Sequence, residues 1–382
     1  MAETKIEWTD ATWNPTTGCD RVSPGCDHCY ALTMAKRLKG MGSAKYQGDG
    51  DPTTSGPGFL ATEHADTLAA PLHWRKPRKV FVNSMSDTFH DRISNGFLAD
   101  MFAIMAITPQ HTYQLLTKRH ARMHAVVNRP EFWTQVGRQA RHFGYHYENA
   151  ANYLRGGQNI YDTNEWKQRR HLDNVWLGTS VENQQWANIR IPALLDTPAA
   201  VRFLSCEPLL GPVDLAKWIG CGDPLHRHHG PCSAYREIES LDWVIVGGES
   251  GHRARPMHPA WARELRDQAV RAGIPFLFKQ WGEWGPAPWV VRVCDPAVGW
   301  QGTADELAAA QADAEARGAT HAYAEWAHEY DHDLYEPPHK PWSIERVEPL
   351  DDRQAPMRRW GKAAAGRELD GREWNEFPAV TS

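Results

Sequence analysis

The sequence has no long hydrophobic run, no apolar leader and no excess of positive charge. No stretch of about 18 apolar residues occurs, so none could cross a membrane as a helix. Residues 1–5 lack the apolar region of a signal peptide, which predicts a cytoplasmic protein. The 42 Lys and Arg are outnumbered by 47 Asp and Glu, for a net charge of −5. A uniformly basic surface is thereby excluded, and any contact with nucleic-acid phosphates must come from a local group of basic residues.

Cysteine is scarce, with seven in 382 residues, and a reducing compartment would disfavour disulfides. Cys19, Cys26 and Cys29 nevertheless follow one another with C-x6-C-x2-C spacing, in a short stretch that also contains glycine and proline. Tight turns there allow the three sulfurs to converge. Three thiolates leave one position open on a tetrahedral ion, or one iron free on a four-iron cluster. The spacing therefore predicts a metal centre with an open position, in a segment that we call the cysteine loop (residues 18–29).

Two other interpretations of the cysteine loop remain open. His28 lies inside the motif, so a closed structural zinc site with three cysteines and one histidine uses the same residues. Alternatively, the cysteines are small buried side chains, or two of them form a disulfide. An open coordination position would favour catalysis, whereas either alternative would favour a structural role.

The rest of the chain alternates between strand-like and helix-like segments. A first strand is expected within 6–17, and six later apolar segments end in polar residues, at 79–87, 112–119, 174–182, 201–207, 242–250 and 275–281. Helical patterns occur at 30–39, 97–107, 119–127, 184–195 and 259–272. Such alternation predicts an α/β fold with a parallel sheet. About seven units favour a full or partial parallel (β/α) barrel of about six to eight strands, and a doubly wound open sheet is the rival.

We expect the barrel to span residues 1–290 and residues 291–382 to form a peripheral C-terminal region with a closing tail. One insertion, 129–171, interleaves basic and aromatic residues, a composition that suits single-stranded or flipped-out nucleic acid. A helical cover with an amphipathic surface would have a similar composition. Most of the 18 tryptophans are expected to be packing residues.

A second insertion, 219–238, is rich in cysteine and histidine. Four of its residues could hold zinc together, namely Cys221, His226, His229 and Cys232. A solvated histidine-rich loop is the alternative, because the spacing matches no zinc-finger pattern.

The carboxyl ends of the strands of a parallel barrel converge over one mouth, where active sites lie. At these ends the sequence places two carboxylates, Glu182 and Glu207, which could orient a substrate or cofactor. Two cations, Lys118 and Lys279, could neutralise a carboxylate or a phosphate. We take these four as the candidate catalytic residues, although each could equally form a structural ion pair. Cys206 is assigned to the core.

The segment T-G-C-x6-C-x-H-C-Y-A resembles the three-cysteine cluster loop of radical S-adenosylmethionine enzymes, although its first spacing is longer than theirs. The segment V-S-P-G-C-x-x-C-Y-A, with later segments and the tail near 357–378, resembles a phage-associated three-cysteine-motif family of unknown function. The resemblance covers most of residues 1–290. It implies a cluster-binding barrel with a [4Fe–4S] cluster on the three cysteines.

The same resemblance to radical enzymes, of which the spore-photoproduct lyases are one version, implies S-adenosylmethionine as a second cofactor. Gly247, Gly248 and Glu249 resemble the element that holds its methionine amine, although the same residues would also suit a tight turn. Ser180 and Tyr30 are further candidates for contact with this cofactor.

Taken together, these patterns predict an iron–sulfur protein, namely a radical S-adenosylmethionine-type enzyme that modifies or repairs a nucleotide or nucleic acid. Such an enzyme needs an electron donor, and a phage- or operon-encoded protein could be a partner. The alternative is a non-catalytic, zinc-stabilised, nucleic-acid-binding phage protein.

Overall fold

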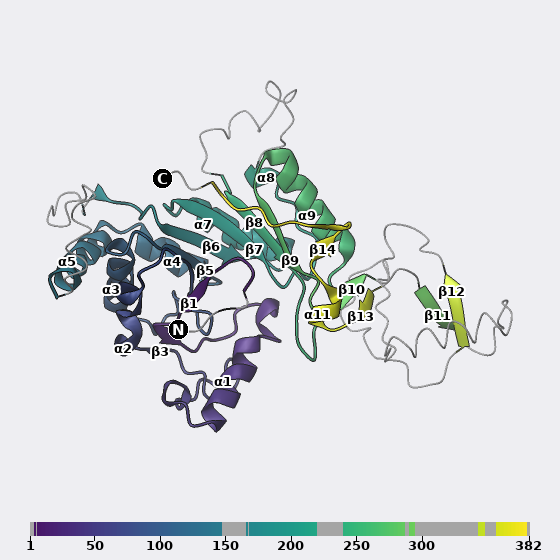
Figure 1. The fold of residues 1–382 in the computed structure, drawn as a ribbon, viewed down its shortest axis with the longest axis horizontal. Helices are drawn as coiled ribbons and strands as arrows, with labels where there is room; N and C mark the ends of the chain where they lie inside the picture. Colours follow the sequence, from purple (N-terminus) through teal and green to yellow (C-terminus); the bar gives the residue numbers. More distant parts are fainter. Residues whose placement is uncertain are drawn as a thin grey trace, which may run out of the picture.

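The computed structural model describes residues 4, 6–146, 166, 168–219, 240–286, 290–294, 343–347 and 357–379. At its centre lies a seven-stranded, all-parallel sheet in the order β1-β4-β5-β6-β7-β8-β9 (Figure 1). The strands are β1 (Ala11–Trp13), β4 (Lys79–Val82), β5 (Thr112–Thr117), β6 (Val175–Ser180), β7 (Val201–Cys206), β8 (Trp243–Gly247) and β9 (Phe276–Gln280). Their order follows the chain without reversal, whereas a doubly wound sheet reverses at a switch point. The curled sheet forms a half-barrel, so the prediction of a partial parallel barrel is confirmed.

The helices lie close to the segments that their sequence patterns predict. They are α1 (Tyr30–Gly40), α2 (Ala65–Leu68), α3 (Asn95–Ala106), α4 (His120–Val127), α5 (Pro130–His146), α7 (Gln184–Leu195), α8 (Ala216–Ile219), α9 (Pro259–Ala272) and α11 (Lys362–Ala365). Ser94 caps α3 by accepting a hydrogen bond from the Phe97 backbone N–H, and Asn183 caps α7 in the same way. Gly273 ends α9 in the left-handed conformation that glycine favours. None of the described helices is long and apolar enough to span a membrane.

The larger hydrophobic core lies between the helices and one face of the sheet. Alternate strand residues such as Val82, Leu115 and Leu204 point into it, because successive side chains of a strand face opposite ways. Phe102 of α3 and Trp133 of α5 pack in the same core. Each large apolar side chain buried there contributes about 1.5–3 kcal/mol. Cys206 is fully buried in this core, which confirms its assignment as a packing residue.

An aromatic layer fills the other face of the sheet, where the missing half of the barrel would be. Phe203 and Trp243 point inward from β7 and β8, and Trp8 of the N-terminal segment packs against both. Phe377 of the C-terminal tail stacks on Trp243 with ring centroids 5.1 Å apart. Gly178 of β6 leaves room for the Phe203 ring, since a Cβ there would lie 2.5 Å from it. The two ends of the chain thus replace strands in closing the inner face.

The C-terminal tail runs along the free edge of β9. The Phe278 backbone N–H donates to the Trp374 carbonyl at 3.0 Å, and the Glu376 N–H donates to the Phe276 carbonyl at 3.2 Å. The remaining short strands form two-stranded pairs: β2 (Thr16–Thr17) with β3 (Thr62–Glu63), β10 (Trp284–Pro286) with β13 (Met357–Arg359), β11 (Val290–Cys294) with β12 (Ser343–Val347), and β14 (Glu368–Leu369) with β15 (Arg372–Glu373). The tail therefore clamps the sheet edge.

The described part of the basic and aromatic insertion is mostly helix. Phe132 and Trp133 of α5 are buried against α3, and Trp166 is buried in the same core. These rings pack as a helical cover would require, so they are not available for stacking on bases. Residues 147–165, which carry other aromatic and basic members of the insertion, lie outside the described residues, as do residues 220–239 with the possible second metal site.

Asp100 on α3 carries a pH-dependent cost to stability. Burial, reinforced by the nearby Glu63, raises the pKa of Asp100 from 3.8 to about 6. Its Oδ1 is buried without a hydrogen-bond partner. A carboxyl whose pKa is raised by folding is most favourable when protonated, so its contribution falls as the pH rises from about 4 to about 6.

We expect Asp100→Asn to be more stable than the wild type at pH 7, by roughly 1 kcal/mol after allowance for the partial exposure of this side chain. The gain should vanish near pH 4. Urea denaturation of both proteins between pH 4 and 8 measures this difference. A gain that stays constant with pH would show that the ionisation of Asp100 is not its cause.

Candidate functional site

The cysteine loop lies at the carboxyl ends of the strands. Gly18 begins it with a positive φ of 83°, and a Cβ at this position would lie 2.1 Å from the Leu60 carbonyl oxygen. Cys26 ends a short 3-10 turn (Pro24–Cys26), and its carbonyl accepts a hydrogen bond from the Cys29 N–H. Cys29 in turn occupies the N-cap position of α1. The predicted order of strand, cysteine loop and helix is present, although the first strand is divided into β1 and β2.

The three cysteines are partly buried free thiols that influence one another electrostatically. Burial raises the pKa of Cys19, with a further contribution from the buried Asp87, and Cys26 and Cys29 add smaller ones. Burial also raises the pKa of Cys29, against an opposing effect from Lys118. Buried thiols become thiolates only when a cation compensates them, and a metal provides that compensation.

The donor set fits a thiolate-binding metal or cluster in its chemistry. Three soft sulfur donors come from one short loop, and a lysine ammonium lies within electrostatic reach of two of them. The described residues contain no group of three or more His, Cys, Asp or Glu already positioned to hold an ion.

Glu182, at the end of β6, anchors one side of the cysteine loop. Its side chain is fully buried, forms an ion pair with Arg190 of α7 at 2.9 Å and accepts a hydrogen bond from the Ser23 hydroxyl at 2.7 Å. Gly25 packs directly on this carboxylate, because a Cβ at Gly25 would lie 2.5 Å from the Glu182 Oε1. The Arg190 guanidinium also lies over the Trp186 ring, 4.2 Å from its centroid. One oxygen of this carboxylate thus holds the loop through Ser23, and both are paired with Arg190.

Glu249, just after β8, anchors the other side of the loop through Arg255. The Arg255 backbone N–H and Nε donate to the Glu249 Oε2 at 2.8 and 2.9 Å, and its Nη2 donates to Oε1 at 2.7 Å. The same Nη2 also donates to the Pro24 carbonyl at 2.8 Å. His28 completes the group, with its Nδ1 3.4 Å from the Glu249 Oε2. Burial would lower the pKa of Arg255, but the hydrogen bonds and charge of Glu249 raise it.

Close backbone packing accounts for the two glycines before Glu249. A Cβ at Gly247 would lie 2.5 Å from the Glu207 Oε1, and one at Gly248 would lie 1.8 Å from the Trp281 carbonyl oxygen. These contacts leave no room for a side chain at either position. They also bring Glu207, from the end of β7, directly over β8.

Polar side chains at the ends of the central strands form the floor beneath the cysteine loop. The Lys279 Nζ lies 3.0 Å from the Glu207 Oε1, and the Ser205 hydroxyl donates to the Glu207 Oε2 at 3.1 Å. The Lys118 Nζ donates to the Ser180 hydroxyl at 3.1 Å. Burial would lower the pKa of Lys118, but the neighbouring Cys26, Glu182 and Cys29 raise it, so its ammonium stays charged.

The four candidate catalytic residues therefore separate in the structure, with Glu182 engaged by Arg190 and Ser23. Glu207 and Lys279 form one pair, and Lys118 lies with Ser180 nearer the cysteines and makes no ion pair with a described carboxylate. Tyr30 exposes 57% of its surface but turns its hydroxyl inward to the Ser84 carbonyl. Burial of that hydroxyl, together with Cys29, raises the pKa of Tyr30.

Arg190 and Arg255, which complete the two anchors, were not predicted as site residues. Each lies close in sequence to its glutamate, but nothing in the pattern indicates that the pair would hold the cysteine loop. Asp87 is a further buried carboxylate near Cys19, and it accepts hydrogen bonds from the Thr117 hydroxyl at 2.6 Å and the Lys118 N–H at 2.9 Å. It fixes the ends of β4 and β5 relative to each other.

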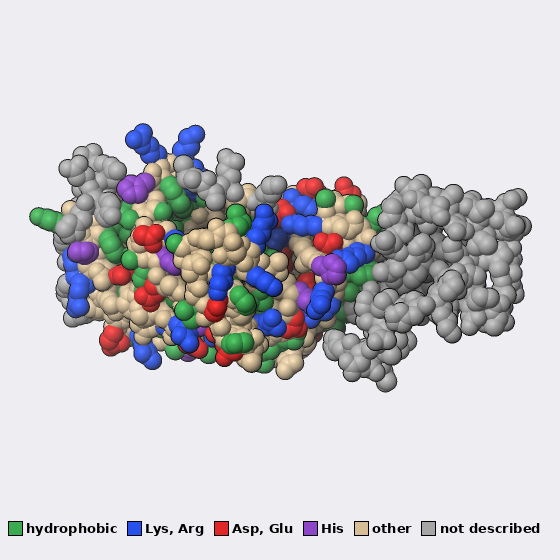
Figure 2. Space-filling model, turned by 90° about the horizontal axis from the view of Figure 1, so that it is seen from below, with side chains coloured by type: hydrophobic (Ala, Val, Ile, Leu, Met, Phe, Trp, Pro, Cys, Tyr) green, Lys and Arg blue, Asp and Glu red, His purple; other side chains and the backbone are tan. Residues whose placement is uncertain are grey.

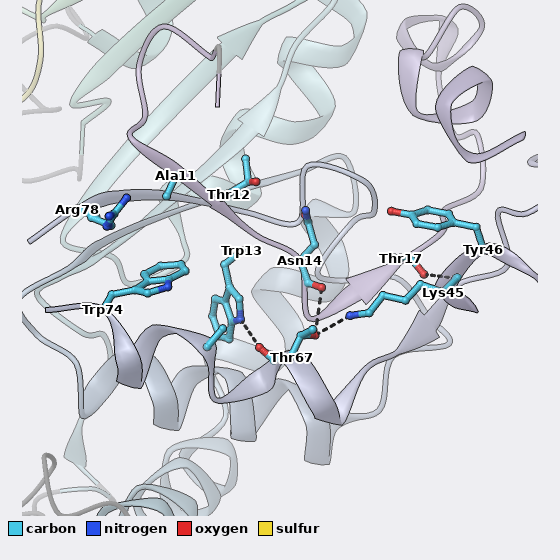
Figure 3. Close-up of a pocket in the computed structure, with 11 residues that line it drawn as sticks. Ala11, Thr12, Trp13, Asn14, Thr17, Lys45, Tyr46, Thr67, Trp74 and Arg78 are labelled. Atoms are coloured by element: carbon cyan, nitrogen blue, oxygen red, sulfur yellow. Dashed lines mark hydrogen bonds between the residues drawn. The ribbon is translucent and has the colours of Figure 1, made fainter. Parts of the chain in front are cut away.

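Two pockets among the described residues lie along or beside the segments that lead into the cysteine loop. One, of about 420 Å³, lies along the edge strand β1, with Trp74 and Arg78 at one end and Lys45 and Tyr46 at the other (Figure 3). None of its lining residues belongs to the cysteine loop. The other, of about 360 Å³, is lined by the start of the cysteine loop and by three arginines.

Fold and site together define a partial parallel (β/α) barrel whose mouth is crossed by a three-cysteine loop anchored on two buried glutamates. The chain belongs to the family described as "Protein of unknown function (DUF5131)", whose profile matches residues 3–378. Searches of curated proteins and of solved structures give no significant match. The family match extends through the closing tail, so the segment that clamps β9 is part of the family's common sequence.

Proposed function

We propose that this protein is an iron–sulfur enzyme of the radical S-adenosylmethionine type that acts on a nucleotide or nucleic acid, in modification or repair. One observation carries the proposal: three partly buried thiols lie in a single loop that two buried glutamates, each paired with an arginine, hold at the carboxyl-terminal mouth of a parallel barrel. Parallel barrels place their chemistry at this mouth. A purely structural metal site would not require such a position.

In the proposed enzyme, different residues at the mouth would have different roles. A cluster bound by Cys19, Cys26 and Cys29 supplies electron transfer and one open iron. Lys118 carries a charged ammonium beside the cysteines and can bind an anionic group of a ligand there. Ser180 orients that ammonium through its hydroxyl.

Glu207 and Lys279 form the polar surface farther along the strand ends, and their pairing keeps the carboxylate fixed in direction. Glu207 and Lys279 are better candidates than Glu249 for contact with a substrate or with the amine of S-adenosylmethionine. Glu249 already accepts three hydrogen bonds from Arg255, so we assign it to holding the cysteine loop. An electron donor is required, and the phage association implied by the sequence suggests a partner encoded nearby.

A second candidate is a zinc-stabilised nucleic-acid-binding protein without catalysis. It is favoured by the position of His28, whose Nδ1 lies near the Glu249 carboxylate. Histidines that bind zinc commonly present their other ring nitrogen to a carboxylate in this way. Cys19, Cys26, Cys29 and His28 would then close a tetrahedral site.

Metal analysis of anaerobically purified protein separates the two candidates. We expect iron and acid-labile sulfide, and an electron paramagnetic resonance signal of the reduced protein that changes when S-adenosylmethionine is added. Zinc in place of iron would favour the binding protein. A cluster signal that is indifferent to S-adenosylmethionine would exclude the radical mechanism while leaving a cluster-binding protein.

A further inference from the structure

Phosphate recognition in this protein has to come from a local site. On the face seen in Figure 2, blue basic and red acidic side chains are interspersed over the described part of the surface. This pattern agrees with the net charge of −5. A nucleotide or nucleic acid would therefore be held by a small group of cations and not by a broad basic surface.

We propose that the pocket beside Cys19 binds a phosphate group of the substrate through Arg21, Arg92 and Arg119. The pocket has a volume of about 360 Å³, within the usual range for small-molecule sites. Its lining residues come from the cysteine loop, from the 50–61 loop, from the segment before α3 and from the end of β5; the charged ones are Asp20, Arg21, Asp51, Arg92 and Arg119. The proposal rests on the proposed function for the identity of the ligand as substrate.

The arginines of this pocket have little internal charge compensation. Neither Arg21 nor Arg92 forms an ion pair with a described carboxylate, and both side chains are exposed. Arg119 pairs through Nη1 with Asp91 at 3.2 Å, but the Asp91 side chain is itself 74% exposed. The Arg119 Nε is buried and has no hydrogen-bond partner in the described part of the chain. Guanidinium groups with few or no close carboxylate partners favour bidentate binding of phosphate oxygens.

The two carboxylates that line the pocket are already engaged by hydrogen bonds. Asp20 accepts from the Thr54 and Ser55 hydroxyls at 2.6 and 2.9 Å, and the His90 Nε2 lies 2.9 Å from its other oxygen. Asp51 accepts from the backbone N–H and the hydroxyl of Thr53 at 2.7 and 2.6 Å. The lining itself carries three arginines and two aspartates, a formal excess of one positive charge, and Asp91, outside the lining, pairs with Arg119.

The pocket adjoins the cysteine loop. Asp20 directly follows Cys19, and Arg119 lies close enough to Cys19 to lower the pKa of that thiol against the larger effect of burial. A phosphate held by these arginines would therefore lie beside Cys19, at the start of the cysteine loop. The ligand chemistry is a phosphate monoester or diester, supplied either by a free nucleotide or by a nucleic-acid strand.

The test uses the full chain and two probes, thymidine 5′-monophosphate and a short single-stranded DNA oligonucleotide. Binding is measured for the wild type, for the double variant Arg21→Gln/Arg92→Gln and for Arg271→Gln, an exposed arginine on α9 that lies outside the pocket. We expect the double variant to raise the Kd of at least one probe about tenfold or more, with Arg271→Gln near the wild type. For the oligonucleotide, the dependence of log Kd on log salt should fall by about 1 per lost contact.

The two probes distinguish the sources of the phosphate. Loss of binding for the mononucleotide indicates a free nucleotide, and loss for the oligonucleotide alone indicates a strand. Equal Kd values in the double variant and the control, or no binding of either probe to the wild type, would overturn the phosphate site.

Iron content measured on the same samples separates this proposal from the proposed function. Arginine-dependent binding in a protein without iron would retain the phosphate site and reject the cluster enzyme. An iron-containing protein whose binding ignores the arginines would reject only the phosphate site.

Discussion

Replacing Glu182 with alanine is expected to lower the free energy of unfolding by about 3–5 kcal/mol, because it leaves the Arg190 guanidinium buried without a countercharge. Both side chains are fully buried and their ion pair is 2.9 Å long. The Arg190 Nε and Nη2 already lack hydrogen-bond partners among the described residues, and the contacts that would remain, to the Ser180 carbonyl and the Trp186 ring, carry no negative charge. Chemical denaturation monitored by tryptophan fluorescence measures the change.

Two further variants show whether the buried charge is the cause. The double variant Glu182→Ala/Arg190→Met removes both charges and should recover much of the lost stability. The exposed pair of Lys45 and Asp66 provides a matched control, since Asp66→Ala should change stability by less than about 1 kcal/mol. A loss in Glu182→Ala no larger than in Asp66→Ala would contradict the anchoring role of Glu182.

If the proposed cluster is bound, substitution of Cys19, Cys26 or Cys29 with alanine is expected to reduce bound iron to background, because the cluster would have only three protein thiolate ligands and would lose one of them. The ferric absorbance and the iron content of each variant measure this effect. The fold should persist, since the loop is also held by Glu182 and Glu249.

Cys206→Ala is the matched control, because Cys206 is a fully buried free thiol in the core between sheet and helices. It should keep its iron and lose only about 1 kcal/mol of stability through the cavity it leaves. Iron that survives in the three loop variants, or disappears equally in Cys206→Ala, would reject the cysteine loop as the binding site.

The architecture could be predicted from the sequence because each strand and helix has its own pattern. The apolar segments at 112–119, 174–182 and 201–207 became β5, β6 and β7, and the helical pattern at 184–195 became α7 at the same bounds. Strands covered on both faces are uniformly apolar, and their polar ends mark the barrel mouth. The first strand was predicted less well, because its two parts pair with different partners, β1 with β4 and β2 with β3.

The functions of the individual carboxylates were less predictable. Glu182, Glu207 and Glu249 are all acidic residues at strand ends, and their local sequences do not distinguish them. In the structure Glu182 holds the cysteine loop through Ser23, Glu249 holds it through Arg255, and Glu207 faces Lys279 on the floor of the mouth. A charged side chain's role depends on which countercharge lies within a few ångströms of it, and that is a property of the packed chain.

What could be read from the amino-acid order was local: strand and helix segments, the cysteine spacing, and the direction in which the barrel would open. These follow from side-chain periodicity and turn chemistry over a few neighbouring residues. Long-range packing determined which distant residues meet. It placed Trp8 and Phe377, from opposite ends of the chain, in one aromatic layer, and it brought the arginines of three separate segments to one pocket beside Cys19. Such contacts depend on distances across the folded chain, and no local pattern encodes them.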